Sequence, residues 1–388
     1  MKRAVCIGGS VLALLTAAGL TRPAFVTLAA QAKAAAPTVA VDPLWPKPFP
    51  QKKAWILGSV TGVTVDAQDH IWVVHRGVDS LQTNEKGPAL EPWASSCCFA
   101  APQILEFDVA GTLLNSWEPK EMKGFDWPHD PSGIAVDKAG NVYVGSGLWP
   151  TSLAPARGRG PAPAAGGAAR GGAAPAAGDA AAAGRGRGAA PAAPAPATAV
   201  LKFDKTGKYV SSISGLERPF GVAVDDATNE LYVADDGHGR VAVFDANSGS
   251  LKREFKSNGE AFKTISCVKL SKDGMVYVCD RQNNRIQVFK KDGTFVKDGY
   301  VAKDTKGDGS VWDVAFSPDQ KVLFVADGHN KTVWMLDRAS LEQIGRFGDG
   351  GRYPGLFYGV GSVAVDSKGN VYTGETYDGK RVQKFVKK

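Results

Sequence analysis

Long apolar runs are almost absent from this chain of 388 residues, although 44% of its residues are hydrophobic. The one such run, 4–20, contains Gly and Thr and is short for a membrane span, which needs about 20 residues. It follows the basic residues Lys2 and Arg3 and precedes the small residues of 30–32, as in a signal peptide. We therefore predict a signal peptide over 1–32, export to the periplasm or the extracellular space, and no transmembrane span after cleavage.

Strong charge of one sign is also lacking once the chain is divided into its parts. The formal net charge is +7, and removal of Lys2, Arg3 and Arg22 with the signal peptide leaves +4. The segment 155–198 contains five arginines and one aspartate, which accounts for all of that +4. The rest of the chain is close to neutral and lacks the basic field that attracts nucleic acid or anionic lipid. We predict no nucleic-acid partner.

The segment 155–198 is rich in Ala, Gly, Pro and Arg. A segment of this composition cannot bury a core, so we predict a disordered insertion there. Its "RGRG" pieces are similar to RNA-binding tails, but an exported protein rarely meets RNA. A linker or an interaction loop is the favoured interpretation.

Cysteine is scarce, and the five cysteines become four when Cys6 leaves with the signal peptide. Cys267 and Cys279 lie on the two strands of one predicted hairpin, at about equal distance from its turn. Opposed residues on such strands are about 4.5–5.5 Å apart, which suits a disulfide, and export makes one possible. Buried free thiols are the alternative. Cys97 and Cys98 are adjacent in a loop.

One phrase, by contrast, occurs six times along the chain. It consists of a short apolar strand, a tight turn containing Asp, Gly, Asn or Lys, and a second strand rich in Val and Tyr. An Asp or Ser closes the first strand, and its side chain can accept backbone N–H bonds from the turn. The copies run over 62–74, 133–145, 221–234, 267–279, 313–326 and 362–374. Their closing residues are Asp66, Asp137, Asp225, Ser271, Ser317 and Asp366.

The spacing of these copies identifies the fold. The last three steps between closing residues are 46, 46 and 49 residues, and the step of 88 becomes 44 when 155–198 is removed. A period near 45 with four short strands per unit is typical of propeller blades. We therefore predict an all-β, six-bladed β-propeller over 44–388, preceded by a flexible segment over 33–43.

The ends of the chain should close the ring. The chain stops with "RVQKFVKK" at 381–388, a third strand with no fourth strand behind it. An open ring would leave strand edges exposed. The missing strand must therefore come from the N-terminal side, and we expect "KKAWILG" at 52–58 to pair with the last blade.

Histidines are few, and four of the five fall on one predicted face. In a propeller, the loops after second strands and the loops between blades emerge on the same face. This rule places His75, His129, His238 and His329 together and leaves His70 on the opposite face. Loops displayed by a rigid scaffold commonly carry function. The same face should also hold Arg76, Arg281, Asp236, Asp280, Asp327, Trp312 and Asp313.

The repeats resemble the NHL-repeat family of six-bladed propellers over nearly all of 44–388. The pieces "HRG" at 75–77 and "DRQNNRIQVF" at 280–289 are similar to peptidyl-α-hydroxyglycine amidating lyase. The likeness also extends to bacterial exported NHL proteins of unassigned function. The resemblance implies that Arg76 and Arg281 hold an anion and that the tyrosine base of the lyase falls near Gly237 or His238. The implied catalytic residues are therefore Arg76, Arg281 and His238.

The metal site implied by this resemblance is incomplete. Zinc-binding histidines would stand just ahead of first strands, where this chain has Ser132 and Ser266. His129 could take the first role after a shift of three residues, and nothing replaces the second. Zinc ligands must converge at about 2.0–2.3 Å, which histidines on alternate blades do not do by default. The sequence therefore does not predict a particular cofactor. Zinc and calcium are the ions to test, and His129 is the predicted metal ligand.

Three functions remain open. We favour a monomeric exported propeller that binds a peptide, a small anionic ligand or an envelope protein on its loop-rich face. The alternative is a peptidylamidoglycolate lyase-like carbon–nitrogen lyase with a rearranged metal site, and a third is a module for cell-envelope assembly. Arg76 and Arg281 can hold a carboxylate in bidentate fashion or can pair with acidic neighbours. No Gly-x-Ser-x-Gly elbow is present.

Overall fold

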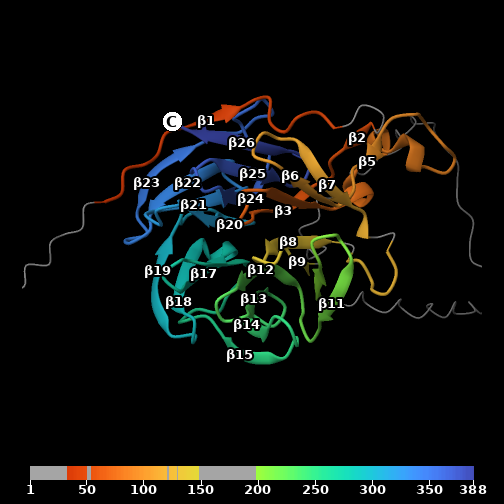
Figure 1. Ribbon diagram of the computed structural model, residues 1–388. Coiled ribbons are helices and arrows are strands. Elements are labelled where there is room, and N and C mark those ends of the chain that lie inside the picture. The colour runs from red at the N-terminus through yellow and green to blue at the C-terminus, as the bar shows by residue number, and fades with distance from the viewer. Residues whose placement is uncertain (1–32, 50–53, 120–121, 129, 148–197) are drawn as a thin grey trace, which may run out of the picture. The chain divides into compact units, whose positions relative to one another are not determined.

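Six four-stranded antiparallel sheets are arranged as the blades of a propeller in the computed structural model (Figure 1). The structure describes residues 33–49, 54–119, 122–128, 130–147 and 198–388. The innermost strands of the blades contact one another in cyclic order, and the last contacts the first. The predicted all-β six-bladed propeller is confirmed. The predicted signal peptide and nearly all of the predicted insertion lie outside the described residues.

The first three blades follow one another along the chain. Blade one contains β3 (Val60–Val65), β4 (Ile71–His75), β6 (Ile104–Phe107) and β7 (Leu113–Trp117). Blade two contains β8 (Pro131–Val136), β9 (Val142–Ser146), β10 (Val200–Phe203) and β11 (Tyr209–Ile213). Blade three contains β12 (Pro219–Asp225), β13 (Glu230–Asp235), β14 (Arg240–Asp245) and β15 (Leu251–Phe255).

The last three blades complete the ring. Blade four contains β16 (Ile265–Leu270), β17 (Met275–Asp280), β18 (Arg285–Lys290) and β19 (Phe295–Tyr300). Blade five contains β20 (Asp313–Phe316), β21 (Val322–Asp327), β22 (Thr332–Asp337) and β23 (Gln343–Phe347). Blade six contains β24 (Val360–Val365), β25 (Val371–Glu375), β26 (Val382–Lys387) and β1 (Val39–Asp42).

The remaining elements lie in loops. A short parallel pair joins β2 (Trp55–Ile56) to β5 (Phe99–Ala100). Single-turn 3-10 helices are η2 (Gly77–Ser80), η3 (Thr83–Glu85), η4 (Gly87–Ala89) and η6 (Arg281–Asn283). No helix among the described residues has the length and apolar character needed to cross a bilayer.

The residue that closes each first strand holds the following turn. Asp66 accepts hydrogen bonds from the backbone N–H groups of Gln68 and His70 at 2.8 and 2.9 Å. Ser317 accepts one from the N–H of Val322 at 2.9 Å. Asp137, Asp225, Ser271 and Asp366 do the same in the other blades. The repeated phrase therefore reflects the same local hydrogen bonding in every blade.

The ring is closed by β1, which pairs with β26 from Val39 opposite Lys387 to Asp42 opposite Lys384 (Figure 1). The prediction that an N-terminal strand completes the last blade is confirmed, but the choice of 52–58 is wrong. Within that segment, β2 pairs with β5 instead. The closing strand lies inside 33–43, a segment that we predicted to be flexible. Val39 and Val41 pack against the core of blades five and six, which gives β1 its apolar contacts.

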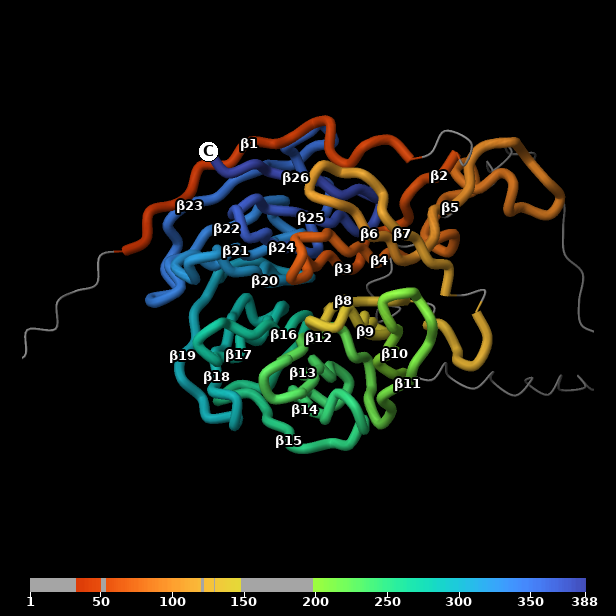
Figure 2. Tube along the Cα trace, in the orientation of Figure 1, coloured from red at the N-terminus to blue at the C-terminus, as the bar shows by residue number. Residues whose placement is uncertain are grey.

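The chain after β1 makes a further contact between the first and last blades. Figure 2 shows this segment continuing from β1 along the last blade toward β2. Trp45 is only 5% exposed, and its ring lies 5.8 Å from that of Phe107 in blade one and 5.1 Å from that of Tyr372 in blade six. Trp45 therefore packs against both blades that meet at the closure.

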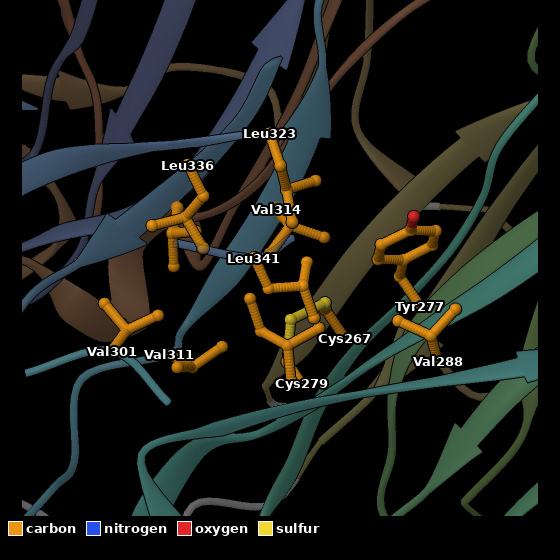
Figure 3. Close-up of a cluster of buried hydrophobic side chains, with 12 residues drawn as sticks. Cys267, Tyr277, Cys279, Val288, Val301, Val311, Val314, Leu323, Leu336 and Leu341 are labelled. Atoms are coloured by element: carbon orange, nitrogen blue, oxygen red, sulfur yellow. A yellow bond between two sulfur atoms is a disulfide. The ribbon is translucent and has the colours of Figure 1, made fainter. Parts of the chain in front are cut away.

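Cys267 and Cys279 are joined by a disulfide on opposed positions of β16 and β17. Figure 3 shows this disulfide among apolar side chains that include Val311 and Leu341. It lies in the core between blades four and five. Cys97 and Cys98 form a second disulfide between adjacent residues of the loop before β5.

Trp45→Ala should test how much the packing of Trp45 between blades one and six stabilises the protein. We expect it to lower the free energy of unfolding by about 3–5 kcal/mol, because it empties a buried aromatic site between two blades. The neighbouring Leu44 is 82% exposed, so Leu44→Ala is a matched control with an expected change of about 0.5 kcal/mol or less. Urea unfolding measures both, and equal stabilities of the two variants would contradict this role for Trp45.

Candidate functional site

The innermost strands approach closely around the propeller axis and enclose a central channel. A Cβ atom on Gly133 would lie 2.4 Å from the carbonyl oxygen of Phe220, and one on Gly221 would lie 2.7 Å from the Cα of Cys267. Only glycine allows this approach. In blades five and six the equivalent positions carry Asp313 and Ser362, so that side of the channel is more polar. A cavity of about 70 Å³ in the channel is lined by residues of all six blades.

Arg281 lies at the loop-rich end of this cavity, in the helix η6 that follows β17. It is only 4% exposed, and its guanidinium stacks 3.4 Å from the ring centre of Trp312. Its Nε donates a hydrogen bond to the carbonyl oxygen of Asp308 at 2.7 Å. The indole of Trp312 is itself held, since its Nε1 donates to the carbonyl oxygen of Gly309 at 2.7 Å. Arg281 is therefore fixed in place, and burial lowers the pKa of its guanidinium.

Tyr377 connects Arg281 to Arg76, which lies in the loop after β4 of blade one. Its hydroxyl donates to Oδ2 of Asp308 at 3.0 Å, and it interacts electrostatically with both arginines. Arg76 also pairs through Nε with Oδ1 of Asp130 at 3.0 Å. Burial raises the pKa of Tyr377 to about 12, a shift that Arg281 opposes and Asp308 reinforces. These five residues, Arg76, Asp130, Arg281, Asp308 and Tyr377, form what we call the mouth cluster.

Tyr377 and Asp308 were not singled out from the sequence. Tyr377 stands two residues after Glu375, which ends the second strand of blade six. The equivalent residue in blade three is Gly237, two residues after Asp235, and the amidating-lyase resemblance implied its tyrosine base near that point. A comparison of all six second-strand ends would have drawn attention to Tyr377. Asp308 lies in the loop "KDTKGDGS" before blade five, which has no counterpart in the repeat.

Asp236 lies beside the mouth cluster and pairs with Arg218, whose Nη2 is 3.1 Å from its Oδ2. Its Oδ1 accepts a hydrogen bond from the N–H of Ile265 at 2.8 Å, which joins blade three to blade four. Burial raises the pKa of Asp236, and Arg218 and Arg281 oppose the shift. With Arg218 and Asp236 included, this region contains three arginines and three aspartates.

Another ion pair lies deeper in the channel. Nζ of Lys269 is 3.2 Å from Oδ1 of Asp313, and both residues line the central cavity. Oδ2 of Asp313 accepts a hydrogen bond from the N–H of Val363, and burial raises the pKa of this carboxyl. The position of Lys269 is taken by Thr64, Ala135, Ala223, Ala315 and Ala364 in the other blades. Lys269 also borders a larger cavity of about 500 Å³ at the opposite end of the channel.

His75 belongs to the scaffold. It is fully buried, its Nδ1 accepts hydrogen bonds from the N–H groups of Gly58 and Gly77, and its Nε2 lies 2.9 Å from the carbonyl oxygen of Pro102. Burial lowers its pKa from 6.5 to about 4. Buried polar residues end the second strands of the other blades in the same way, namely Ser146, Asp235, Asp280, Asp327 and Glu375.

Asp280, Asp327 and His238, which were also selected from the sequence, bond to residues outside the mouth cluster. Asp280 accepts hydrogen bonds from Arg285, and Asp327 accepts them from Asn330 and Trp334, so both hold local turns. His238 is 45% exposed and bonds through Nδ1 to Asp235 at 2.7 Å. His329 is exposed, and His129 lies outside the described residues. Of the predicted set, the structure brings together Arg76 and Arg281, with Asp236, Trp312 and Asp313 nearby.

Neither a protein-family model nor a curated protein sequence matches this chain. Among solved structures, it is similar to a streptogramin B lyase, with a TM-score of 0.50 and 10% identity over 86% of this chain and 94% of that one. It is also similar to a protein of unknown function from Bacteroides thetaiotaomicron, with a TM-score of 0.51 and 12% identity over 85% and 70% of the two chains. At these identities the similarity shows a shared propeller fold.

The buried His75 should make stability depend on pH. The folded protein keeps this imidazole neutral down to about pH 4, whereas the unfolded chain protonates it near pH 6.5. The unfolded state therefore binds more protons between these values, and stability is lost as the pH falls. We expect a loss of about 3 kcal/mol from this residue between pH 7 and pH 4.

Urea unfolding at several pH values measures this effect. His75→Gln should have a shallower dependence on pH than the wild type, while His329→Gln, which changes an exposed histidine, should match the wild type. Identical pH dependence in the wild type and His75→Gln would contradict the buried neutral state.

Proposed function

We propose that this protein is an exported NHL-type propeller that binds the carboxylate end of a peptide, or a similar small anion, at the mouth cluster. One observation carries the proposal: Arg76 of blade one and Arg281 of blade four both act on Tyr377 at the end of the central channel. Two guanidiniums at one point form a suitable set of donors for a carboxylate, and the hydroxyl of Tyr377, which donates to Asp308, lies beside them.

The surroundings of Arg281 favour a binding role. Its stacking on Trp312 and its bond to the carbonyl of Asp308 orient the guanidinium before any ligand arrives. A preorganised donor loses little side-chain entropy on binding. Its burial also removes water, which strengthens the interaction between a guanidinium and an incoming carboxylate.

The acidic residues of the region favour a peptide over a simple inorganic anion. Asp130, Asp236 and Asp308 stand among the arginines and can accept hydrogen bonds from N–H groups. A peptide terminus offers a carboxylate to the arginines and amide N–H groups to the aspartates. The cavity of about 70 Å³ beneath Arg281 has room for a small side chain.

A lyase activity is the second candidate. Arg76, Arg281 and Tyr377 match the residue types that the amidating-lyase resemblance implies, although the tyrosine comes from blade six. One similar fold is a streptogramin B lyase. Ser132 and Ser266 line the central cavity where that resemblance implies zinc-binding histidines, and their hydroxyls donate to the carbonyl oxygens of Pro219 and Val311. These serines do not fit a zinc site, so no step is assigned to a metal here.

Titration calorimetry with paired ligands tests the binding proposal. The probes are N-acetylated tripeptides ending in glycine, with either a free carboxylate or a carboxamide. We expect the acid to bind at least tenfold more tightly than the amide, a difference of about 1.4 kcal/mol. Arg281→Ala and Arg76→Ala should remove this preference. Arg281→Lys should keep part of it, because the charge remains and the bidentate geometry is lost.

Arg346→Ala serves as the control, because Arg346 is 47% exposed on the outer strand of blade five. It should bind the acid as the wild type does. Equal affinity for the acid and the amide, or unchanged affinity in a folded Arg281→Ala variant, would overturn the proposal.

The lyase candidate is tested separately with an α-hydroxyglycine peptide. If the protein is a lyase, it releases glyoxylate, and Tyr377→Phe, which loses the hydroxyl that exchanges a proton, lowers the rate. Binding of the tripeptide acid without any release of glyoxylate would assign the protein as a binder without this activity.

A further inference from the structure

A group of metal-ligating side chains lies on the face opposite the mouth cluster. It consists of Asp66 and His70, from the turn between β3 and β4, and Glu106 of β6. Nδ1 of His70 lies 2.8 Å from Oε1 of Glu106 and 3.7 Å from Oδ2 of Asp66, and all three donor atoms lie within 4.8 Å of one another. No lysine or arginine of the described chain forms an ion pair with either carboxylate.

Comparison of the blades shows that this group is particular to blade one. In blades two and six the residue four positions after the closing aspartate is Asn141 or Asn370, whose amide donates to that aspartate. In blade one this residue is His70. The asparagines show that the turn does not need a histidine for its fold.

The third member differs from its counterparts in charge. Glu106 lies opposite Trp72 in the strand register, and the equivalent residues of blades two and six are Lys202 and Lys384. In blades three, four and five the position holds Val243, Val288 and Met335. Blade one alone therefore combines a histidine with a second carboxylate at this place.

The two carboxylates are partly withdrawn from water. The side chains of Asp66 and Glu106 are 6% and 14% exposed, whereas that of His70 is 33% exposed and gives access from solvent. Burial raises the pKa of Glu106, and the charge of Asp66 adds to this shift while His70 opposes it. Two negative groups held together at low exposure are stabilised by a cation between them.

The spacing of the donor atoms suits a first-row divalent ion. At metal–ligand distances of about 2.1 Å, the separations of 2.8 and 3.7 Å correspond to angles of about 85° and 125° at the metal. Oδ2 of Asp66 accepts one hydrogen bond, from Nε1 of Trp72, which leaves it a second lone pair. One imidazole and two carboxylates suit zinc better than calcium, which prefers six to eight oxygen ligands.

We propose that Asp66, His70 and Glu106 bind a divalent transition-metal ion of the zinc class on the face opposite the anion site. The three side chains supply three ligands, and water completes the coordination through the exposed side of His70. The ion would tie the turn between β3 and β4 to strand β6 and so stabilise blade one. This site is independent of the mouth cluster.

Titration of the chelator-treated full chain with zinc chloride tests the proposal. We expect one zinc ion per chain and a higher thermal unfolding midpoint with zinc. His70→Asn should weaken binding at least tenfold without unfolding the protein, because asparagine serves the same turn in blades two and six. Glu106→Gln should also weaken binding at least tenfold while keeping the size of the side chain.

Two further variants complete the test. His329→Asn changes an exposed histidine and should bind zinc as the wild type does, and so should His129→Ala, which removes the metal ligand expected from the sequence. No zinc binding by the wild type would overturn the proposal. So would wild-type affinity in both His70→Asn and Glu106→Gln, or loss of binding only in His129→Ala.

Discussion

The pairing of β1 with β26 is the constraint on which the rest of the structure depends, because it makes blade one and blade six neighbours. Arg76 in blade one and Tyr377 in blade six lie far apart in the sequence, and ring closure brings them together in space. The hydroxyl of Ser59 donates to the carbonyl oxygen of Tyr377 at 2.6 Å, directly across this junction. The mouth cluster is therefore a product of ring closure, and no single blade could form it.

Much of the fold could be predicted from the sequence because its signals are local. The aspartate or serine that closes each first strand acts on its own turn, and the apolar strands on either side are short and regular. The closing strand was predicted at 52–58 but lies at Val39–Asp42, because either segment can form a strand. Only the packing of Val39 and Val41 against blades five and six decides between them. That information is long-range and is absent from any local pattern.

The site was predicted less completely for the same reason. Arg76 and Arg281 were placed on one face by the order of the strands and were given an anion-binding role by a resemblance, whereas the interaction of Tyr377 with both arginines depends on bringing blades one, four and six around one axis. His75 is the opposite case, because a residue predicted for the ligand-binding face is fully buried and bonds to the backbone of its own loops. Glycine at 133 and 221 brings the strands of blades two to four together, and the polar residues of later blades fill the other side of the channel.

The central claim is that the mouth cluster holds a carboxylate, and a crystal structure of the protein with an N-acetylated tripeptide acid tests it most directly. We expect electron density for the carboxylate within hydrogen-bonding distance of the guanidiniums of Arg76 and Arg281, with Tyr377 beside it. Density for the peptide at the opposite end of the channel, near Lys269, or a mouth cluster that stays unchanged at saturating peptide, would contradict it.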